Sequence, residues 1–165
     1  MFAALPRLLE RAGTGANGKS ITGLYTVLVD GDDMDEPIAD AARSILDGHI
    51  VLSRKLAQLN HFPAIDILAS ASRVMNSVTS EEHQSWAGQV KEWMAVYKQA
   101  EDLINIGAYA KGSNARIDQA ISVYDRIISY LRQKTDDSTT FTDSEGLLHS
   151  IVRSGEAFAQ ANSKK

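Results

Sequence analysis

The sequence contains no cysteine at all among its 165 residues. This absence excludes disulfide bonds, thiolate metal sites and cysteine nucleophiles from this chain, and it fits a reducing compartment. No apolar run approaches the roughly 18 residues that a membrane-spanning helix needs. The N-terminus also lacks the charged segment and apolar core of a secretory signal. We therefore expect a cytosolic protein.

The balance of residue types is that of a globular protein. Apolar residues make up 44% of the chain and charged residues 23%, which excludes a disordered or fibrous protein. The length suits one ordinary domain with a buried core. A net charge of −4 gives no electrostatic reason to expect nucleic acid as a partner, although it leaves a local basic patch open.

Extended and helical patterns alternate over the first part of the chain. Residues 2–12 predict a short helix, and the glycines of GTGANGKS (13–20) predict a loop. The apolar and β-branched run SITGLYTVLV (20–29) predicts a central strand that is buried on both faces. An acidic turn at 30–37 leads to a helix at 38–46. An extended piece at 49–53, a short helix at 54–60 and another extended piece at 62–67 follow. This alternation to about residue 75 predicts part of a mostly parallel α/β sheet.

The second part of the chain carries a helical pattern. Ser80 is suited to cap a helix that runs to about Ile106, and acidic residues follow it in the first turn. A loop, GAYAKGSN (107–114), separates this helix from a second amphipathic one that ends near Leu131. A polar link then leads to a third helix over residues 144–160. We therefore expect an all-helical second part.

One short motif matches a phosphate-binding loop. Gly13, Gly18, Lys19 and Ser20 occupy every fixed position of G-x-x-x-x-G-K-[ST]. That chemistry needs a strand before the loop and a helix after it, because the helix N-terminus supplies positively polarised amides. The predicted order here is the reverse, so we do not interpret the motif as a phosphate site.

Two other segments carry residues that can act on a nucleotide. Phe62 precedes Pro63, which holds it in an extended conformation, and its ring can stack on a base or fill a core. Arg73, between a serine and a valine, can reach across a subunit interface to a transferring phosphoryl group or form a plain salt bridge. The residue types alone leave these alternatives open.

The acidic turn and the histidines do not follow metal-binding patterns. The turn at 30–36 has Met34 where a calcium loop needs an oxygen ligand, and Ala41 where it needs the closing glutamate. The four histidines are too scattered for a zinc spacing; they are His49, His61, His83 and His149. We predict no metal site.

Several consecutive segments resemble one known family. The chain resembles the flagellum-specific type III export ATPase, a relative of the catalytic subunit of rotary ATP synthases, and the injectisome secretion ATPases are similar over the same stretch. The loop at 107–114 favours the flagellar branch. The segments are ERAG (10–13), KSITGLYTVLVDGDDMDEPIAD (19–40), ILDGHIVLSRKLA (45–57), HFPAID (61–66) and SASRVM (70–75).

The resemblance implies a fold and its missing parts. It implies an α/β remnant of a RecA-like P-loop ATPase core over residues 1–78, followed by an all-α C-terminal helical domain over 79–165. The family's phosphate loop, catalytic glutamate and Mg²⁺-site aspartate would lie upstream of this chain. ATP and Mg²⁺ are thus the expected cofactors of a full-length protein, and this chain alone is expected to hold neither and to be inactive.

The resemblance also implies an assembly and a location. It implies a homohexameric ring in the cytoplasm that drives export of flagellar proteins. The ring would lie at the cytoplasmic face of the inner membrane near the flagellar basal body, only peripheral to the membrane. The implied partners are neighbouring subunits, a central stalk protein, export chaperones and export-gate proteins, without nucleic acid.

Residue by residue, the resemblance places a rim of a nucleotide site on this chain. Arg73 falls where the family has an arginine finger that acts in trans. Phe62, with Pro63, falls where an aromatic residue stacks on adenine, and Phe141 matches a second aromatic of that pocket. Thr135 falls where ATP synthase relatives have a further aromatic residue, so this chain departs from the pattern there.

The loop at 107–114 aligns with the part of the relatives that touches the central stalk. Tyr109 and Lys111 are the candidate contacts, and an exposed turn without a partner is the alternative. A second hypothesis treats the chain as a non-catalytic helical module that docks a stalk, chaperone or export-gate protein, since its amphipathic helices could serve either a core or a partner.

Overall fold

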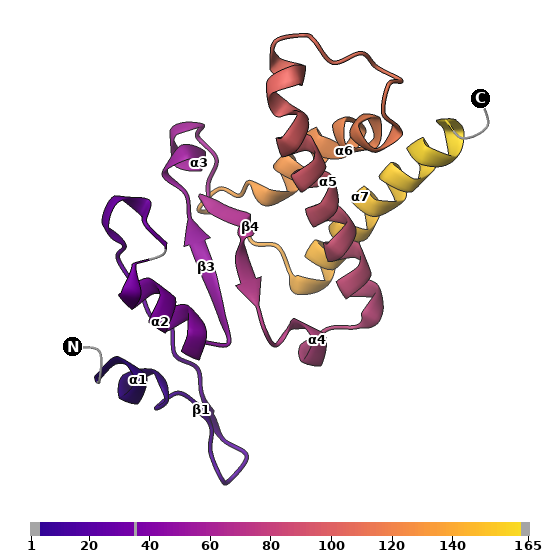
Figure 1. Cartoon of the computed structure of the whole chain (residues 1–165). Helices are drawn as coiled ribbons and strands as arrows, with labels where there is room; N and C mark the ends of the chain where they lie inside the picture. The colour runs from indigo at the N-terminus through magenta and orange to yellow at the C-terminus, as the bar shows by residue number, and fades with distance from the viewer. Residues whose placement is uncertain (1–3, 35, 163–165) are drawn as a thin grey trace. The chain divides into compact units, whose positions relative to one another are not determined.

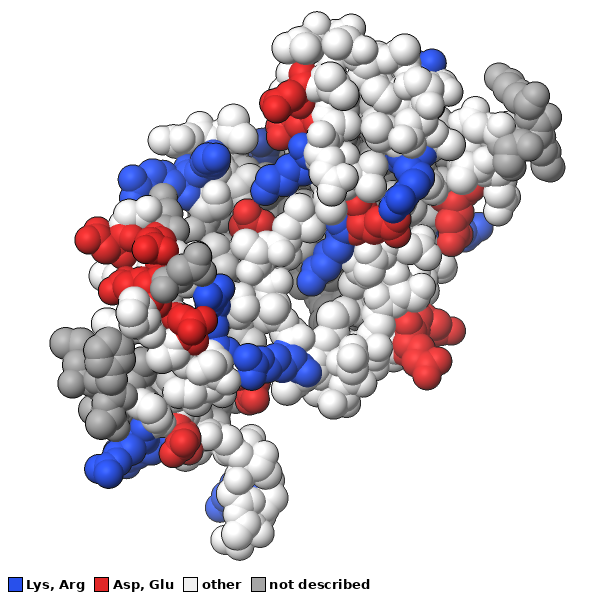
Figure 2. Space-filling view, viewed as in Figure 1, with Lys and Arg blue, Asp and Glu red and all other residues white. Residues whose placement is uncertain are grey.

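The computed structural model of this protein describes residues 4–34 and 36–162 (Figure 1). Internal contacts divide the chain into two compact units, of which the first ends at His49 and the second begins at Ile50. Acidic and basic side chains are interspersed over the visible surface (Figure 2). None of the described helices is long and apolar enough to cross a membrane.

Two short helices form the core of the first unit. Helix α1, Ala4–Leu9, contacts helix α2, Pro37–Ile45, and the proline stands at the start of α2, where its missing N–H is harmless. Leu9, Ala39 and Ala42 are buried. The acidic turn before α2 contains a 3₁₀ helix, η1, Asp30–Asp32.

The glycine-rich loop of the first unit is a small hairpin. Strands β1, Gly13–Thr14, and β2, Ser20–Ile21, pair antiparallel, and the Gly15 N–H donates to the Lys19 carbonyl oxygen at 2.7 Å. Helix α1 precedes the motif and the two-residue strand β2 closes it, in the predicted order, although strand β1 forms at its start, which was not predicted. The amides around Lys19 therefore have no helix N-terminus to project from.

The expected central strand is not formed. Only Ser20–Ile21 of this segment is a strand, and residues 22–29 belong to no sheet. Leu24 is 92% exposed and Leu28 is 90% exposed. The expectation of a mostly parallel sheet is also wrong, because the described residues contain two separate two-stranded sheets. The apolar pattern indicated a segment able to pair, but a strand forms only where a partner strand satisfies its backbone groups.

The second sheet has a short helix in the connection between its two strands. Strand β3, Gly48–Leu52, pairs with strand β4, Ile65–Ser72, and their arrows run in opposite directions in Figure 1. Helix α3, Arg54–Gln58, lies between them in sequence, with the Ser53 side chain accepting from the Leu56 N–H at its start. The Ser53 N–H donates to the Ala64 carbonyl oxygen at 2.8 Å. This bond joins the residue that follows β3 to the residue that precedes β4.

Three long helices form the core of the second unit, as predicted. After the short helix α4, Met75–Val78, come helices α5, α6 and α7, which pack against one another. Their bounds are Glu81–Asn105, Ala115–Leu131 and Phe141–Asn162. The Ser80 side chain accepts from the His83 N–H at 3.2 Å, so the predicted cap is confirmed. The core residues are Val90, Trp93, Ala120, Val123, Ile127, Leu148, Ile151 and Val152.

Helix α7 begins at Phe141, three residues before the expected start at 144. The Thr140 hydroxyl oxygen accepts from the Asp143 N–H at 3.1 Å and lies 2.6 Å from the Asp143 carboxylate. A threonine followed three residues later by an acidic residue is a common helix start. The polar composition of residues 133–140 concealed this signal in the sequence.

One glycine lets α7 approach α5 closely. A Cβ atom added at Gly155 would lie 2.5 Å from Cη2 and 2.7 Å from Cζ2 of Trp93, which is buried. The Gly155 carbonyl oxygen also accepts from the Gln119 side chain at 3.0 Å, so α6 is tied to the same point. The three helices therefore meet where no side chain fits.

We expect Gly155→Ala to destabilise the protein by about 1–3 kcal/mol, because the added methyl overpacks the Trp93 ring. Gly146→Ala in the same helix has nothing within 4 Å of the new Cβ. This matched variant should stabilise by up to about 1 kcal/mol through helix propensity. Urea unfolding followed by tryptophan fluorescence measures both, and equal stability of the two variants would contradict the packing argument.

Candidate functional site

The turn after α3 carries the first predicted site residue. The His61 N–H donates to the Leu56 carbonyl oxygen at 2.9 Å, and Asn60 has a positive φ of 53°, so the chain reverses tightly here. The peptide bond between Phe62 and Pro63 is cis, which the sequence analysis did not foresee. The Phe62 side chain is half exposed and sits where the turn enters β4.

The loop after α6 is bound to this turn. The Gln133 N–H donates to the Phe62 carbonyl oxygen at 2.9 Å, and the Arg132 guanidinium donates to the Leu59 carbonyl oxygen at 3.4 Å. A reverse turn continues the loop, with the Lys134 N–H donating to the Asp137 carboxylate at 2.8 Å. The helical end of the chain thus holds the carbonyl groups of the Phe62 turn through one backbone amide and one side chain.

The same loop ends at the second predicted aromatic residue. Phe141 is the first residue of α7, and it is 70% exposed. Its ring lies parallel to the His83 ring, with 5.9 Å between the centroids and 1° between the planes. Phe62 is thus bonded to the start of this loop and Phe141 stands at its end, and each has exposed ring surface that can stack on a planar ligand.

Arg73 lies on the surface at the bend that follows β4. The strand before it is fixed by side chains. The Ser70 hydroxyl donates to the Asp66 carbonyl oxygen at 2.6 Å and accepts from the Val51 N–H at 2.9 Å. The Asp66 carboxylate accepts from two further backbone amides of the same strand at 3.0 Å. A long cationic side chain is thus presented from an ordered base.

The loop between α5 and α6 has a defined conformation. At the end of α5 the Gly107 N–H donates to the Ile104 carbonyl oxygen, and the Ala108 N–H donates to that of Leu103, the two bonds of a Schellman motif. Gly107 has a φ of 69°, a conformation that favours glycine. The loop therefore leaves the helix in a fixed direction.

The two predicted partner residues of this loop have different environments. The Tyr109 hydroxyl lies 3.1 Å from the Asp118 carboxylate, which also accepts from the Gly112 N–H at 2.9 Å. Tyr109 is only partly exposed, so it orders the loop from within. Lys111 is exposed at the tip, and Ile106, which is 75% exposed, lies at the base.

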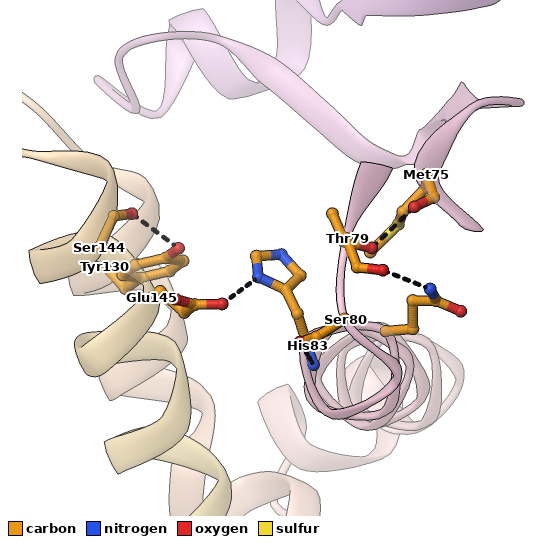
Figure 3. A network of polar contacts seen from close by, with 8 residues as sticks. Met75, Thr79, Ser80, His83, Tyr130, Ser144 and Glu145 are labelled. Atoms are coloured by element: carbon orange, nitrogen blue, oxygen red, sulfur yellow. Dashed lines mark hydrogen bonds and ion pairs between the residues drawn. The ribbon is translucent and has the colours of Figure 1, made fainter. Parts of the chain in front are cut away.

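A polar network that the sequence analysis missed joins helices α5, α6 and α7 near the start of α7 (Figure 3). His83 Nδ1 of α5 is 2.9 Å from Glu145 Oε1 of α7, and the Tyr130 hydroxyl of α6 is 3.0 Å from the Ser144 hydroxyl. The spacing of the histidines, which argues against a metal site, does not reveal this contact. The spacing of Phe141 and Glu145 places both on one face of a helix, but no local pattern indicates that His83 faces them. Among the described residues no cluster of three potential metal ligands occurs.

Comparisons with known proteins identify relatives for both parts of the chain. Residues 1–72 match the ATP synthase alpha/beta family, nucleotide-binding domain, and residues 79–150 match the T3SS EscN ATPase C-terminal domain. These matches confirm the expected fold class, a part of an ATPase core followed by a helical domain. The boundary expected between residues 78 and 79 stays a prediction.

Individual relatives come from flagellar and secretion systems. The flagellum-specific ATP synthase of Bacillus subtilis is 50% identical over 156 residues, which cover 94% of this chain and 35% of the relative. The assembled ATPase EscN from the type III secretion system of enteropathogenic E. coli superposes with a TM-score of 0.87 at 48% identity, covering 92% of this chain and 36% of that one.

A second solved structure contains a partner. It shows the assembled EscN in complex with its central stalk EscO, and it superposes with a TM-score of 0.81 at 47% identity over 92% of this chain and 35% of that one. This chain spans about a third of the length of the curated relatives that it matches.

His61 is a buried titratable residue beside the Phe62 turn. Its side chain is 3% exposed. Burial lowers the pKa of His61 below 6.5, and the positive charge of Arg132 lowers it further. The imidazole of His61 in this turn therefore takes up a proton less readily than that of an unburied histidine.

We expect His61 to make the folded chain less stable in acid. Its folded pKa is below the unfolded value of 6.5, so the unfolded chain binds the proton first and stability falls as the pH drops through this window. His61→Gln should therefore lose less stability than the unaltered chain between about pH 7.5 and about pH 5.5 in urea titrations. His61→Leu, which also lacks a titrating ring, should behave alike, and identical slopes in all three proteins would contradict the assignment.

Proposed function

The chain belongs to the family of flagellar and type III secretion export ATPases, of which it matches the C-terminal part, and we propose that it supplies the rim of an ATP site in a hexameric export ATPase. The observation that carries this proposal is 50% identity over 94% of the chain to a flagellum-specific ATP synthase. The full activity, hydrolysis of ATP to energise the export of flagellar proteins, would belong to the longer protein. The injectisome branch is the alternative.

The aromatic residues of the rim would bind the base of ATP. Phe62 and Phe141 each expose at least half of their side chain, and Pro63 fixes the turn between Phe62 and β4. Exposed aromatic rings contribute stacking energy to a base without a specific hydrogen-bond pattern. Groups that hold the phosphates and Mg²⁺ would come from residues outside this chain, so we expect the chain alone to be inactive.

Arg73 would act on the nucleotide of a neighbouring subunit. Its guanidinium is permanently charged and can donate to two phosphoryl oxygens at once. Negative charge on the transferring group is what such a residue stabilises in the transition state. The ordered end of β4, held by Asp66 and Ser70, supports this role, because an arginine that acts in trans must be presented outward from a fixed base.

The loop between α5 and α6 would bind a central stalk protein. A homologous assembled ATPase has been solved with its central stalk EscO. The ordered loop, with Lys111 at its tip and Ile106 exposed at its base, supports the same use here, because a preformed loop loses little entropy on binding. Export chaperones and export-gate proteins at the cytoplasmic face of the membrane remain further proposed partners.

We expect Arg73→Ala in the full-length ATPase to leave ATP binding unchanged and to lower turnover by about a thousandfold or more, because the charge acts only in the transition state. Turnover and nucleotide affinity in assembled rings measure the two effects separately. Arg153→Ala, at an exposed position of α7, is the control and should retain turnover. Unchanged turnover of the Arg73 variant in assembled rings would exclude the finger.

The stalk contact gives a separate prediction. Lys111→Ala should weaken retention of the stalk protein in a pull-down by about fivefold, the change expected for about 1 kcal/mol at an interface. Replacing residues 107–114 with a neutral linker should abolish retention, and Lys98→Ala, on the exposed side of α5, should not change it. Equal retention with and without residues 107–114 would contradict the docking role.

A further inference from the structure

His83 connects two helices directly behind an exposed aromatic ring. It stands in the first turn of α5, where the Ser80 cap fixes its backbone. Its side chain is 16% exposed and points toward the first turns of α7 (Figure 3). There it meets Glu145 through Nδ1 at 2.9 Å and Phe141 through a parallel ring contact. One imidazole thus contacts two residues that are one helical turn apart.

Two further contacts restrain the start of α7. Thr140 caps the helix, and the Tyr130 hydroxyl of α6 contacts Ser144. These two restraints fix the helix backbone but do not touch the Phe141 ring. The ring contact that the structure gives Phe141 is the one with His83. A ring that is 70% exposed has little packing to select its rotamer, so this contact has a large share in its orientation.

We propose that His83, oriented by Glu145, is a positioning residue that holds the Phe141 ring as a wall for the base of the bound nucleotide. This inference rests on the proposed function, in which Phe141 contacts the base. The hydrogen bond between His83 Nδ1 and Glu145 fixes the plane of the imidazole, and the parallel ring contact favours the same plane for the phenyl ring. A preoriented ring stacks on a base without first losing rotamer freedom.

The same histidine is also close to the segment that follows Arg73, so two routes of action must be separated. The Thr79 hydroxyl donates to the Met75 carbonyl oxygen at 2.7 Å, and the Gln84 amide donates to the Thr79 carbonyl oxygen at 3.0 Å, which fastens α4 to the start of α5. An effect through Phe141 changes nucleotide binding and appears in KM. An effect through the Arg73 segment changes the transition state and appears in kcat.

The experiment is steady-state ATP hydrolysis by the full-length ATPase carrying this chain. We expect His83→Ala to raise the KM for ATP by about three- to tenfold, the range of one lost aromatic contact, with kcat within about twofold. His83→Phe keeps a stacking ring and should retain most of the affinity. His83→Asn keeps a polar group near Glu145 but no ring, and it should resemble His83→Ala.

The second arm tests whether His83 acts through Phe141. In the double variant with Phe141→Ala, His83→Ala should raise KM no further, because the residue it positions is absent. Additive effects of the two substitutions would overturn the inference. If Phe141→Ala alone leaves KM unchanged, the proposed role of Phe141 in base binding fails instead, so the two failures are distinguishable.

His149 provides the matched control. It stacks on Trp86 across the same pair of helices, with 4.3 Å between the ring centroids, but it lies two turns from Phe141 along α7. His149→Ala therefore removes a comparable contact between α5 and α7 but leaves the contact between His83 and Phe141 in place. It should leave KM unchanged. An equal rise in KM for the His149 and His83 variants, or a fall in kcat alone for His83→Ala, would overturn the positioning role.

Discussion

The hydrogen bond from the Gln133 N–H to the Phe62 carbonyl oxygen is the constraint on which the candidate site depends. It fastens a turn near the start of the second unit to the loop between its last two helices. Because both groups are backbone atoms, the contact is insensitive to side-chain identity and requires only that the loop keeps its length and course. Through this contact, a packed helical core determines where the exposed Phe62 ring stands.

Local sequence patterns predicted the elements whose backbone hydrogen bonds form within one segment of the chain. The three long helices, the Ser80 cap and the reversed context of the GKS motif all follow from spacing within one segment. The central strand at 20–29 failed because a strand depends on a partner that its own sequence does not specify. The start of α7 at Phe141 was a local signal that the polar composition around Thr140 concealed.

The residues of the candidate site also differ in how far the sequence indicated them. Residue type and neighbours singled out Phe62 and Arg73 but left their roles open, and only the family resemblance pointed to Phe141, since an exposed aromatic residue has no local pattern of its own. His83 was not found, because its role depends on the distance to Glu145, 62 residues later in the sequence. Contacts of that range follow from how α5 and α7 pack, and Gly155 against Trp93 sets that packing at the other end of the interface.

Compactness and family boundaries divide this chain at different places, and the difference bears on mechanism. The family matches separate residues 1–72 from 79–150, whereas contacts place everything from Ile50 onward in one unit. Strand β4 belongs to the nucleotide-binding match yet contacts α5, and the Phe62 turn is bound to Gln133. Phe62, Arg73, Phe141 and Lys111 therefore share one packed body. A nucleotide at the rim and a stalk protein at the loop would bind that same packed body. Binding of the nucleotide would change the affinity for the stalk only if both partners bind two conformations of this body with different affinities.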